Sequence, residues 1–244
     1  MPRTLSAIAP PVEQRLRDYD WPQLESDLDA HGWAHLPRLL TPDDCVAIAG
    51  LYGEASRFRS RIVMARHGFG RGEYQYFSYP LPEPIATLRG ALYGRLAGLA
   101  NRWHEAMAIA ARFPAAHADF IARCHEAGQT RPTPLILRYE AGGWNALHQD
   151  LYGELVFPLQ VVVGLDRPGV DYTGGEFVVV EQRPRSQSRA TALTVEQGHG
   201  FVFTTRDRPV RSSRGWSTNP MRHGASLVRS GRRHTLGIIF HDAA

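Results

Sequence analysis

The feature of this sequence that most limits its fold is a succession of short β-rich runs in its second half, residues 134–241. Turn-forming segments such as AGG, RPG, TGG and GHG separate the runs, and no helical periodicity lies between them. Many short strands without intervening helices are typical of an all-β sandwich or barrel. We therefore predict strands at LILRY, LVFPLQVVVGL, GEFVVVEQ, ALTVEQ, GFVFTT, ASLV and TLGIIF.

Residues 1–130 follow a different, mainly helical pattern. Thr41 followed by Pro42 and two acidic residues is typical of a helix start, and this helix should extend to about residue 56. Apolar periodicity predicts further helices over 22–30, 83–111 and 114–127, and β-rich runs predict strands within 33–40 and 58–65. We expect one structural unit of α+β class, mainly β: a double-stranded β-helix (jelly roll) with N-terminal helices packed on one side.

The composition is that of an ordinary globular protein, with 43% hydrophobic and 21% charged residues among 244. A formal net charge of +4 is a mild basic bias, which by itself does not predict a nucleic-acid partner. Two cysteines are too few for a disulfide framework, and no run approaches the ~20 apolar residues of a membrane helix. The N-terminus lacks a signal-peptide pattern, so we expect a soluble, cytoplasmic protein.

The tripeptide His148-Gln149-Asp150 is the first candidate for a metal site. Side chains alternate along a strand, so His148 and Asp150 can point to the same face. An imidazole and a carboxylate supply two ligands of a 2-His-1-carboxylate triad, which is typical of non-haem Fe(II) oxygenases. A third ligand would have to come from another strand. Because H-x-D often arises by chance, this pair decides little on its own.

A second group of residues near the C-terminus strengthens the metal hypothesis. His223 lies beside a β-rich run, and ten residues later Arg233 and Thr235 occupy positions that share a strand face. A guanidinium with a nearby hydroxyl suits the distal carboxylate of a dicarboxylic acid, whose other end could chelate the metal. Arg232 could take the same role, but strand parity favours Arg233.

In these segments the sequence resembles the Fe(II)/2-oxoglutarate-dependent dioxygenases, most closely their prolyl-4-hydroxylase-like branch. The resemblance covers about residues 134–241. It rests on four segments in order, namely RYEAGGWNALHQD, TGGEFVVV, GHGFVF and the segment from His223 to Phe240.

The resemblance implies a role for each of these residues. The iron ligands would be His148, Asp150 and His223. Arg233, helped by Thr235, would pair with 2-oxoglutarate, and Tyr139 stands where the family often places a tyrosine that hydrogen-bonds this cosubstrate. A buried core tyrosine would fit the Tyr139 pattern equally well. With Fe(II), 2-oxoglutarate and O2, the expected reaction hydroxylates a C–H bond and releases succinate and CO2.

The sequence leaves the substrate open. The prolyl-hydroxylase-like motifs favour hydroxylation of a protein residue or a small molecule. Oxidative dealkylation of damaged nucleic acid is the alternative, favoured by the basic charge and the arginine-rich residues 206–222. AlkB-type demethylases place an asparagine where Leu137 stands and a further arginine near Ile239, and these differences weaken that alternative. A non-enzymatic β-barrel binding module is a third hypothesis, against which the intact ligand set argues.

Two segments hold the candidate substrate residues. Residues 206–222 place arginines around an aromatic side chain, which could bind phosphates and stack a base, or could form a solvated loop. Residues 66–79 combine glycines, aromatics and arginines, and we expect either a lid over the substrate or an ordinary loop. The candidate substrate contacts are Arg214, Trp216, Arg71 and Tyr74.

Overall fold

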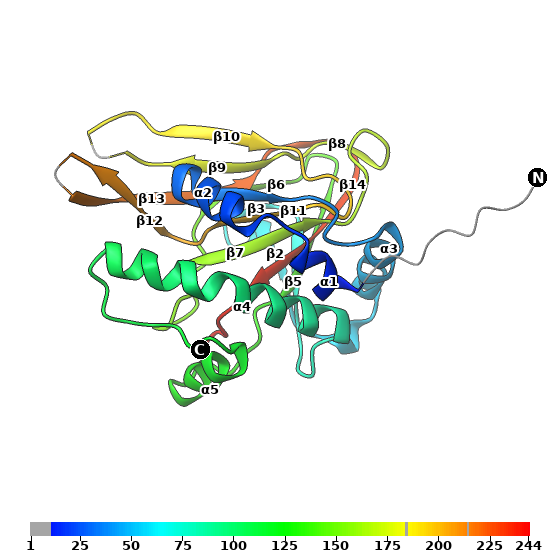
Figure 1. Ribbon diagram of the computed structural model, residues 1–244. Helices are drawn as coiled ribbons and strands as arrows, with labels where there is room; N and C mark the ends of the chain where they lie inside the picture. Colours follow the sequence, from blue (N-terminus) through cyan, green and yellow to red (C-terminus); the bar gives the residue numbers. More distant parts are fainter. Residues whose placement is uncertain (1–10, 184, 214) are drawn as a thin grey trace, which may run out of the picture.

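The structure is a computed structural model that describes residues 11–183, 185–213 and 215–244, and its centre is a pair of antiparallel sheets (Figure 1). The strands are β1 (Trp33–Leu36), β2 (Phe58–Val63), β3 (Gly70–Arg71), β4 (Glu73–Phe77), β5 (Leu135–Glu140), β6 (Trp144–His148), β7 (Leu159–Gly164), β8 (Tyr172–Gly174), β9 (Phe177–Glu181), β10 (Arg189–Leu193), β11 (Gly200–Thr204), β12 (Asp207–Ser212), β13 (Gly215–Ala225) and β14 (Val228–Ile239).

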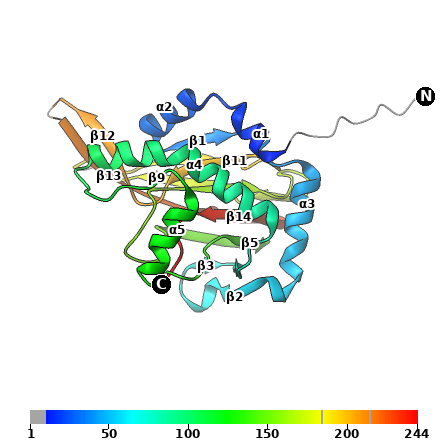
Figure 2. The ribbon, with the colours of Figure 1, turned by 60° about the horizontal axis from the view of Figure 1, so that its bottom comes forward.

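The larger sheet has the order β1-β11-β7-β14-β5-β4-β2, and β8 pairs with β14. The smaller sheet has the order β10-β9-β13-β6-β3, and β12 pairs with β13. The β12–β13 hairpin projects from the body of the molecule in both Figure 1 and Figure 2. This arrangement confirms the predicted fold class, a jelly-roll core supported by helices.

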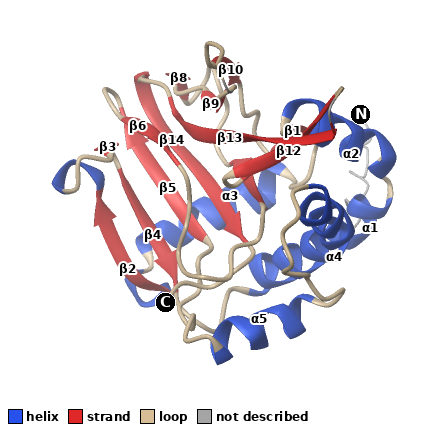
Figure 3. Ribbon diagram, turned by 90° about the vertical axis from the view of Figure 1, so that its left-hand side faces the viewer, coloured by secondary structure: helices blue, strands red, loops and turns tan. Residues whose placement is uncertain are grey.

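The helices cover the outer face of the larger sheet, and α1, α2, α4 and α5 gather on one side of the molecule (Figure 3). The helices are α1 (Val12–Arg17), α2 (Trp21–His31), α3 (Pro42–Gly50), α4 (Glu83–Ala106) and α5 (His117–Glu126). The two faces of strand β7 contribute side chains to two different hydrophobic cores. Val161 and Val163 belong to the core beneath the helices, whereas Val162 belongs to the core between the two sheets. Alternation along the strand produces this division.

The predicted start of helix α3 is confirmed. The Thr41 hydroxyl accepts a hydrogen bond from the Asp44 amide at 3.1 Å, and the Asp44 carboxylate accepts one from the Thr41 amide at 2.9 Å. This reciprocal capping box satisfies two amides that the first turn of a helix leaves without partners. The helix ends at Gly50, earlier than the predicted residue 56, and the chain continues in short 3-10 turns.

Two segments for which the sequence allowed a loop are partly strands. Within residues 66–79, β3 pairs with β6 and β4 lies between β2 and β5 in the larger sheet. Residues 206–222 form most of the β12–β13 hairpin rather than a loop. In residues 66–79, pairing with the distant strands β5 and β6 overrode the local glycine content, whereas in residues 206–222 the two strands pair mainly with each other. In the described residues, no helix is long and apolar enough to span a membrane.

Candidate metal centre

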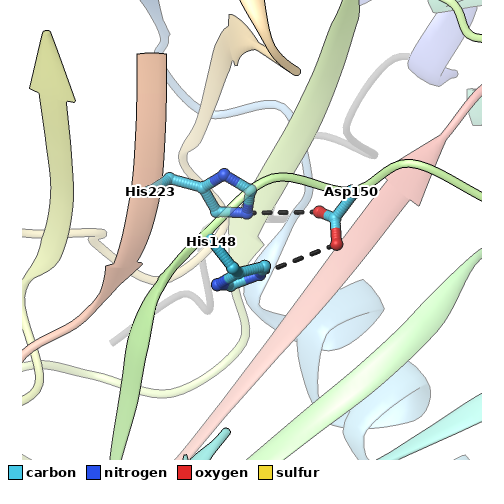
Figure 4. Close-up of side chains that lie close together, drawn as sticks. All are labelled: His148, Asp150 and His223. Atoms are coloured by element: carbon cyan, nitrogen blue, oxygen red, sulfur yellow. Dashed lines mark ion pairs between the residues drawn. The ribbon is translucent and has the colours of Figure 1, made fainter. Parts of the chain in front are cut away.

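Three side chains converge between the sheets in the way that a metal site requires (Figure 4). His148 at the end of β6 and His223 in β13 are directly opposite each other in the antiparallel ladder. Asp150 follows β6 by two residues, outside any strand. One ligand atom from each residue lies within 4.8 Å of the others. From strand alternation, we predicted that His148 and Asp150 share one face of a strand. In the structure β6 ends at His148, and the irregular segment that follows it carries Asp150 to the metal site.

The ring nitrogens of the two histidines are arranged for ligation. The His148 Nδ1 donates to the backbone carbonyl of Ala146 at 2.7 Å, which leaves Nε2 to face Asp150 at 3.6 Å. The His223 Nε2 lies 3.2 Å from the other Asp150 oxygen, and its Nδ1 is buried without a hydrogen-bond partner among the described residues. A backbone acceptor on Nδ1 fixes both the tautomer and the ring orientation of a histidine ligand.

The charge states of the triad also suit a divalent cation. Burial alone would raise the pKa of the Asp150 carboxyl, but the two histidines and the hydroxyl of Tyr152 together hold it below its ordinary value. Burial, assisted by the charge of His148, lowers the pKa of His223. Both shifts favour the forms that bind metals, an ionised carboxylate and a neutral imidazole.

The triad opens into a cavity of about 330 Å³ between the two sheets. Arg233 and Thr235 of β14 line this cavity together with Tyr139 of β5, and all three side chains are buried. Arg232 has the opposite orientation, since its side chain is exposed and its nearest carboxylate is that of Glu140 at 3.8 Å. The two neighbouring arginines therefore point to opposite faces of β14, as strand parity predicts.

Arg233 is a buried cation without a carboxylate partner. It is 2% exposed, and no carboxylate oxygen of the described residues lies within 4.0 Å of its guanidinium nitrogens. Within the part of the chain that the structure describes, its Nε is buried without a hydrogen-bond partner, while the guanidinium lies over the rings of Tyr139 and Tyr172. Burial raises the pKa of Tyr139, so this phenol is a neutral hydrogen-bonding group. A buried guanidinium that lacks an anion is costly, and an anionic ligand in the cavity would offset that cost.

These residues fit Fe(II) and 2-oxoglutarate. Two imidazoles and one carboxylate are the donor set that favours Fe(II) with open positions. Arg233, which has no carboxylate partner among the described residues, lies in the same cavity and matches the carboxylate of a dicarboxylic acid.

The structure separates the predicted substrate residues. Tyr74 lines the cavity, whereas Arg71 and Trp216 do not. Trp216 lies on the projecting hairpin, where it is 51% exposed and the guanidinium of Arg211 lies 5.2 Å from its ring. Arg214 lies outside the described residues.

Sequence reasoning missed several residues of the cavity. Tyr152 donates a hydrogen bond to Asp150 at 2.6 Å, and Tyr76 donates one to Tyr152 at 2.9 Å. Gln160 lines the cavity from β7, with its amide nitrogen buried and without a partner in the described chain. The only sequence signal for Gln160 was a polar residue inside the apolar run LVFPLQVVVGL.

Phe69 and Leu147 line the cavity while remaining 47% and 42% exposed, so they belong to its mouth.

Three solved structures of similar architecture are described as prolyl hydroxylases or as a member of the 2OG-Fe(II) oxygenase family. A prolyl hydroxylase of Trichoplax adhaerens, in complex with a hypoxia-inducible-factor peptide, has a TM-score of 0.59 at 12% identity, over 94% of this chain and 90% of its own. A Pseudomonas putida prolyl-4-hydroxylase has a TM-score of 0.55 at 14% identity, over 92% and 100%. A 2OG-Fe(II) oxygenase family protein of Burkholderia pseudomallei has 0.53 at 16%, over 93% of each chain. The fold is therefore that of the prolyl-4-hydroxylase-like Fe(II)/2-oxoglutarate oxygenases, as the sequence predicted.

A family model assigns the chain to one particular family within this fold class. The model of the Oxygenase-NA family, described as an oxygenase catalysing oxidative methylation of damaged DNA, matches residues 72–243. The chain belongs to this oxygenase family. Two uncharacterized proteins of Mycobacterium tuberculosis, from strains CDC 1551 / Oshkosh and ATCC 25618 / H37Rv, are 60% identical to it over 168 residues. These residues are 69% of this chain and 72% of each relative.

Proposed function

We propose that this chain is an Fe(II)- and 2-oxoglutarate-dependent oxygenase in which His148, Asp150 and His223 hold the iron. The observation that carries the proposal is one cavity that combines this triad with a buried guanidinium for which the described residues supply no carboxylate. When bound, iron and 2-oxoglutarate supply the oxidation of a C–H bond by O2, with release of succinate and CO2.

The protein's own side chains supply binding and orientation. Arg233 offers a fork of N–H donors to the distal carboxylate, and Thr235 adds a hydroxyl from the same strand face. Tyr139 contributes a neutral phenol, which burial prevents from ionising. The apolar lining from Leu135, Val162 and Phe203 limits water around these polar groups, which strengthens their interactions with an anion.

Damaged DNA is the substrate class that we propose for this oxygenase. The description of the family supports it, and so does the mouth of the cavity. Phe69 is half exposed there and stacks on His67 with ring centres 5.3 Å apart. Beside the mouth, Arg71 of β3 and Trp144 of β6 are opposite each other and exposed. Exposed aromatics next to an arginine suit an unstacked base with its phosphates. Hydroxylation of a protein residue or small molecule, which the motifs alone favoured, becomes the second candidate.

The proposal is tested in two stages. The anaerobic protein with Fe(II) and 2-oxoglutarate should show a charge-transfer band at roughly 500 nm, as such iron chelates do. The Asp150→Asn variant is the matched control and should lack the band. If the wild-type protein gives no band, the assignment of the cofactors is wrong.

The substrate class is tested by products. With an N-methylated oligonucleotide, hydroxylation of the methyl group gives a hemiaminal that releases formaldehyde, so succinate and formaldehyde should form in equal amounts. With prolyl peptides or metabolites, succinate should stay at the level formed without substrate. Stoichiometric hydroxylation of a peptide or metabolite, without formaldehyde from the oligonucleotide, would support the second candidate instead. Affinity for the oligonucleotide should fall steeply with salt.

A further inference from the structure

Asp150 differs from the two histidines in how it is held. His148 and His223 lie in paired strands, so ladder hydrogen bonds orient their backbone. Residues 149–152 have no regular secondary structure, yet Asp150 is only 7% exposed. The Gln149 side chain anchors this segment by donating to the Met221 carbonyl at 2.9 Å. That bond fixes the loop but not the rotation of the carboxylate.

Two tyrosines form the hydrogen bonds that hold the rotation of the Asp150 carboxylate. The Tyr152 hydroxyl donates to Asp150 Oδ1 at 2.6 Å and accepts a hydrogen bond from the Tyr76 hydroxyl at 2.9 Å. A phenol has one hydrogen, so the bond received from Tyr76 leaves the hydrogen of Tyr152 for Asp150. Chains of this kind polarise one another and strengthen the last bond.

The far end of this chain is rigid. Tyr76 is 7% exposed in β4, where its neighbours across the ladder are Ser60 of β2 and Leu135 of β5. The guanidinium of Arg59 lies 4.5 Å from the centre of the Tyr76 ring and donates to the carbonyl of Pro132 at 2.9 Å. The larger sheet therefore holds Tyr76, and through it Tyr152.

We infer that Tyr152 is a positioning residue that orients Asp150 for the metal, and that Tyr76 supports it in this role. The phenol binds Oδ1 and so sets the rotation of the carboxylate, which places Oδ2 3.2 Å from His223 Nε2. The inference rests on the proposed function, since it concerns the same metal site. Groups that hydrogen-bond a ligating carboxylate typically change metal affinity about 10- to 100-fold when they are removed.

The test uses Co(II) as a spectroscopic probe without 2-oxoglutarate or turnover. Tyr152→Phe removes the hydroxyl and keeps the ring, so we expect about 10- to 100-fold weaker Co(II) binding and an altered visible ligand-field spectrum. Tyr76→Phe should weaken binding by a smaller factor. Tyr93→Phe is the matched control, because the Tyr93 phenol is also buried but donates to the Pro114 carbonyl at 2.8 Å, outside the cavity. It should leave both the affinity and the spectrum unchanged.

The outcomes separate this inference from the proposed function. If the wild-type protein does not bind Co(II), the metal site and the inference both fail. If the wild-type protein binds Co(II) and Asp150→Asn does not, but Tyr152→Phe matches Tyr93→Phe in affinity and spectrum, the inference alone is overturned. If Tyr152→Phe does not fold, Tyr76→Phe carries the test, and wild-type affinity in that variant overturns the inference.

Discussion

The guanidinium carbon of Arg233 lies 5.5 Å from the centre of the Tyr139 ring, across the ladder that pairs β14 with β5. The ring covers one side of a cation that has no carboxylate partner among the described residues. Such stacking partly stabilises a desolvated guanidinium but leaves its N–H donors free for an anion. The pair is thus arranged to receive a carboxylate from the cavity.

Replacement of the two adjacent arginines should change the affinity for 2-oxoglutarate by very different factors. Arg233→Ala removes charge-assisted hydrogen bonds of roughly 1.5–3 kcal/mol, so 2-oxoglutarate should bind about 10- to 150-fold more weakly. Arg232→Ala, at the exposed neighbouring position, should leave this affinity within about twofold. Calorimetric titration of the Co(II) protein with 2-oxoglutarate measures both. The reverse order would mean that Arg232 binds the cosubstrate.

Two exposed aromatics allow a matched comparison of substrate contacts. Phe69→Ala removes a side chain at the cavity mouth, and Trp216→Ala removes one on the projecting hairpin, at nearly equal exposure. Base stacking is worth roughly 1–3 kcal/mol, so Phe69→Ala should lower kcat/KM for a methylated oligonucleotide about 5- to 150-fold. Trp216→Ala should change it much less. A larger loss in Trp216→Ala would place the nucleic acid along the hairpin.

The buried ion pair of Arg89 and Asp242 should dominate the stability of the C-terminal segment. The guanidinium and carboxylate are 2.8 Å apart at 2% and 0% side-chain exposure. Removal of one partner leaves an uncompensated buried charge, so Asp242→Asn should lower the free energy of unfolding by about 3–5 kcal/mol. Glu54→Gln, in an exposed pair with Arg57, should cost less than about 1 kcal/mol. Equal effects in urea unfolding would contradict this expectation.

Stability should fall as the pH drops from about 6.5 to about 4. Burial, helped by the charge of Arg89, lowers the pKa of His117 to about 4, and burial does the same for His241. In this window the unfolded chain binds more protons than the folded one, so acid favours unfolding, by on the order of 3 kcal/mol for each histidine. Urea midpoints followed by circular dichroism measure the slope. His117→Gln should make it shallower, because it removes one of the two buried histidines.

The sequence was most informative where a pattern is local. Short-range spacing predicted the start of a helix at Thr41 and the shared strand face of Arg233 and Thr235. The series of short strands predicted the jelly-roll fold class in the same way. The role of Tyr76 could not be predicted, because the glycines around β4 indicate a loop and only pairing with β2 and β5 makes it a strand. Tyr152 lies in a segment without regular secondary structure, so the direction of its side chain could not be predicted from a helix or strand period. Long-range pairing and loop geometry account for what was missed.

The strand order has a consequence for how the chain can be divided. The first 130 residues supply β1 next to β11 at one end of the larger sheet, and β4 and β2 next to β5 at the other. A fragment restricted to residues 134–241 would expose unpaired backbone N–H and C=O groups along both β11 and β5. Exposed edge strands of this kind pair with other chains and aggregate. We therefore expect that the N-terminal region protects both edges of the oxygenase core, and that the two regions must be produced as one piece.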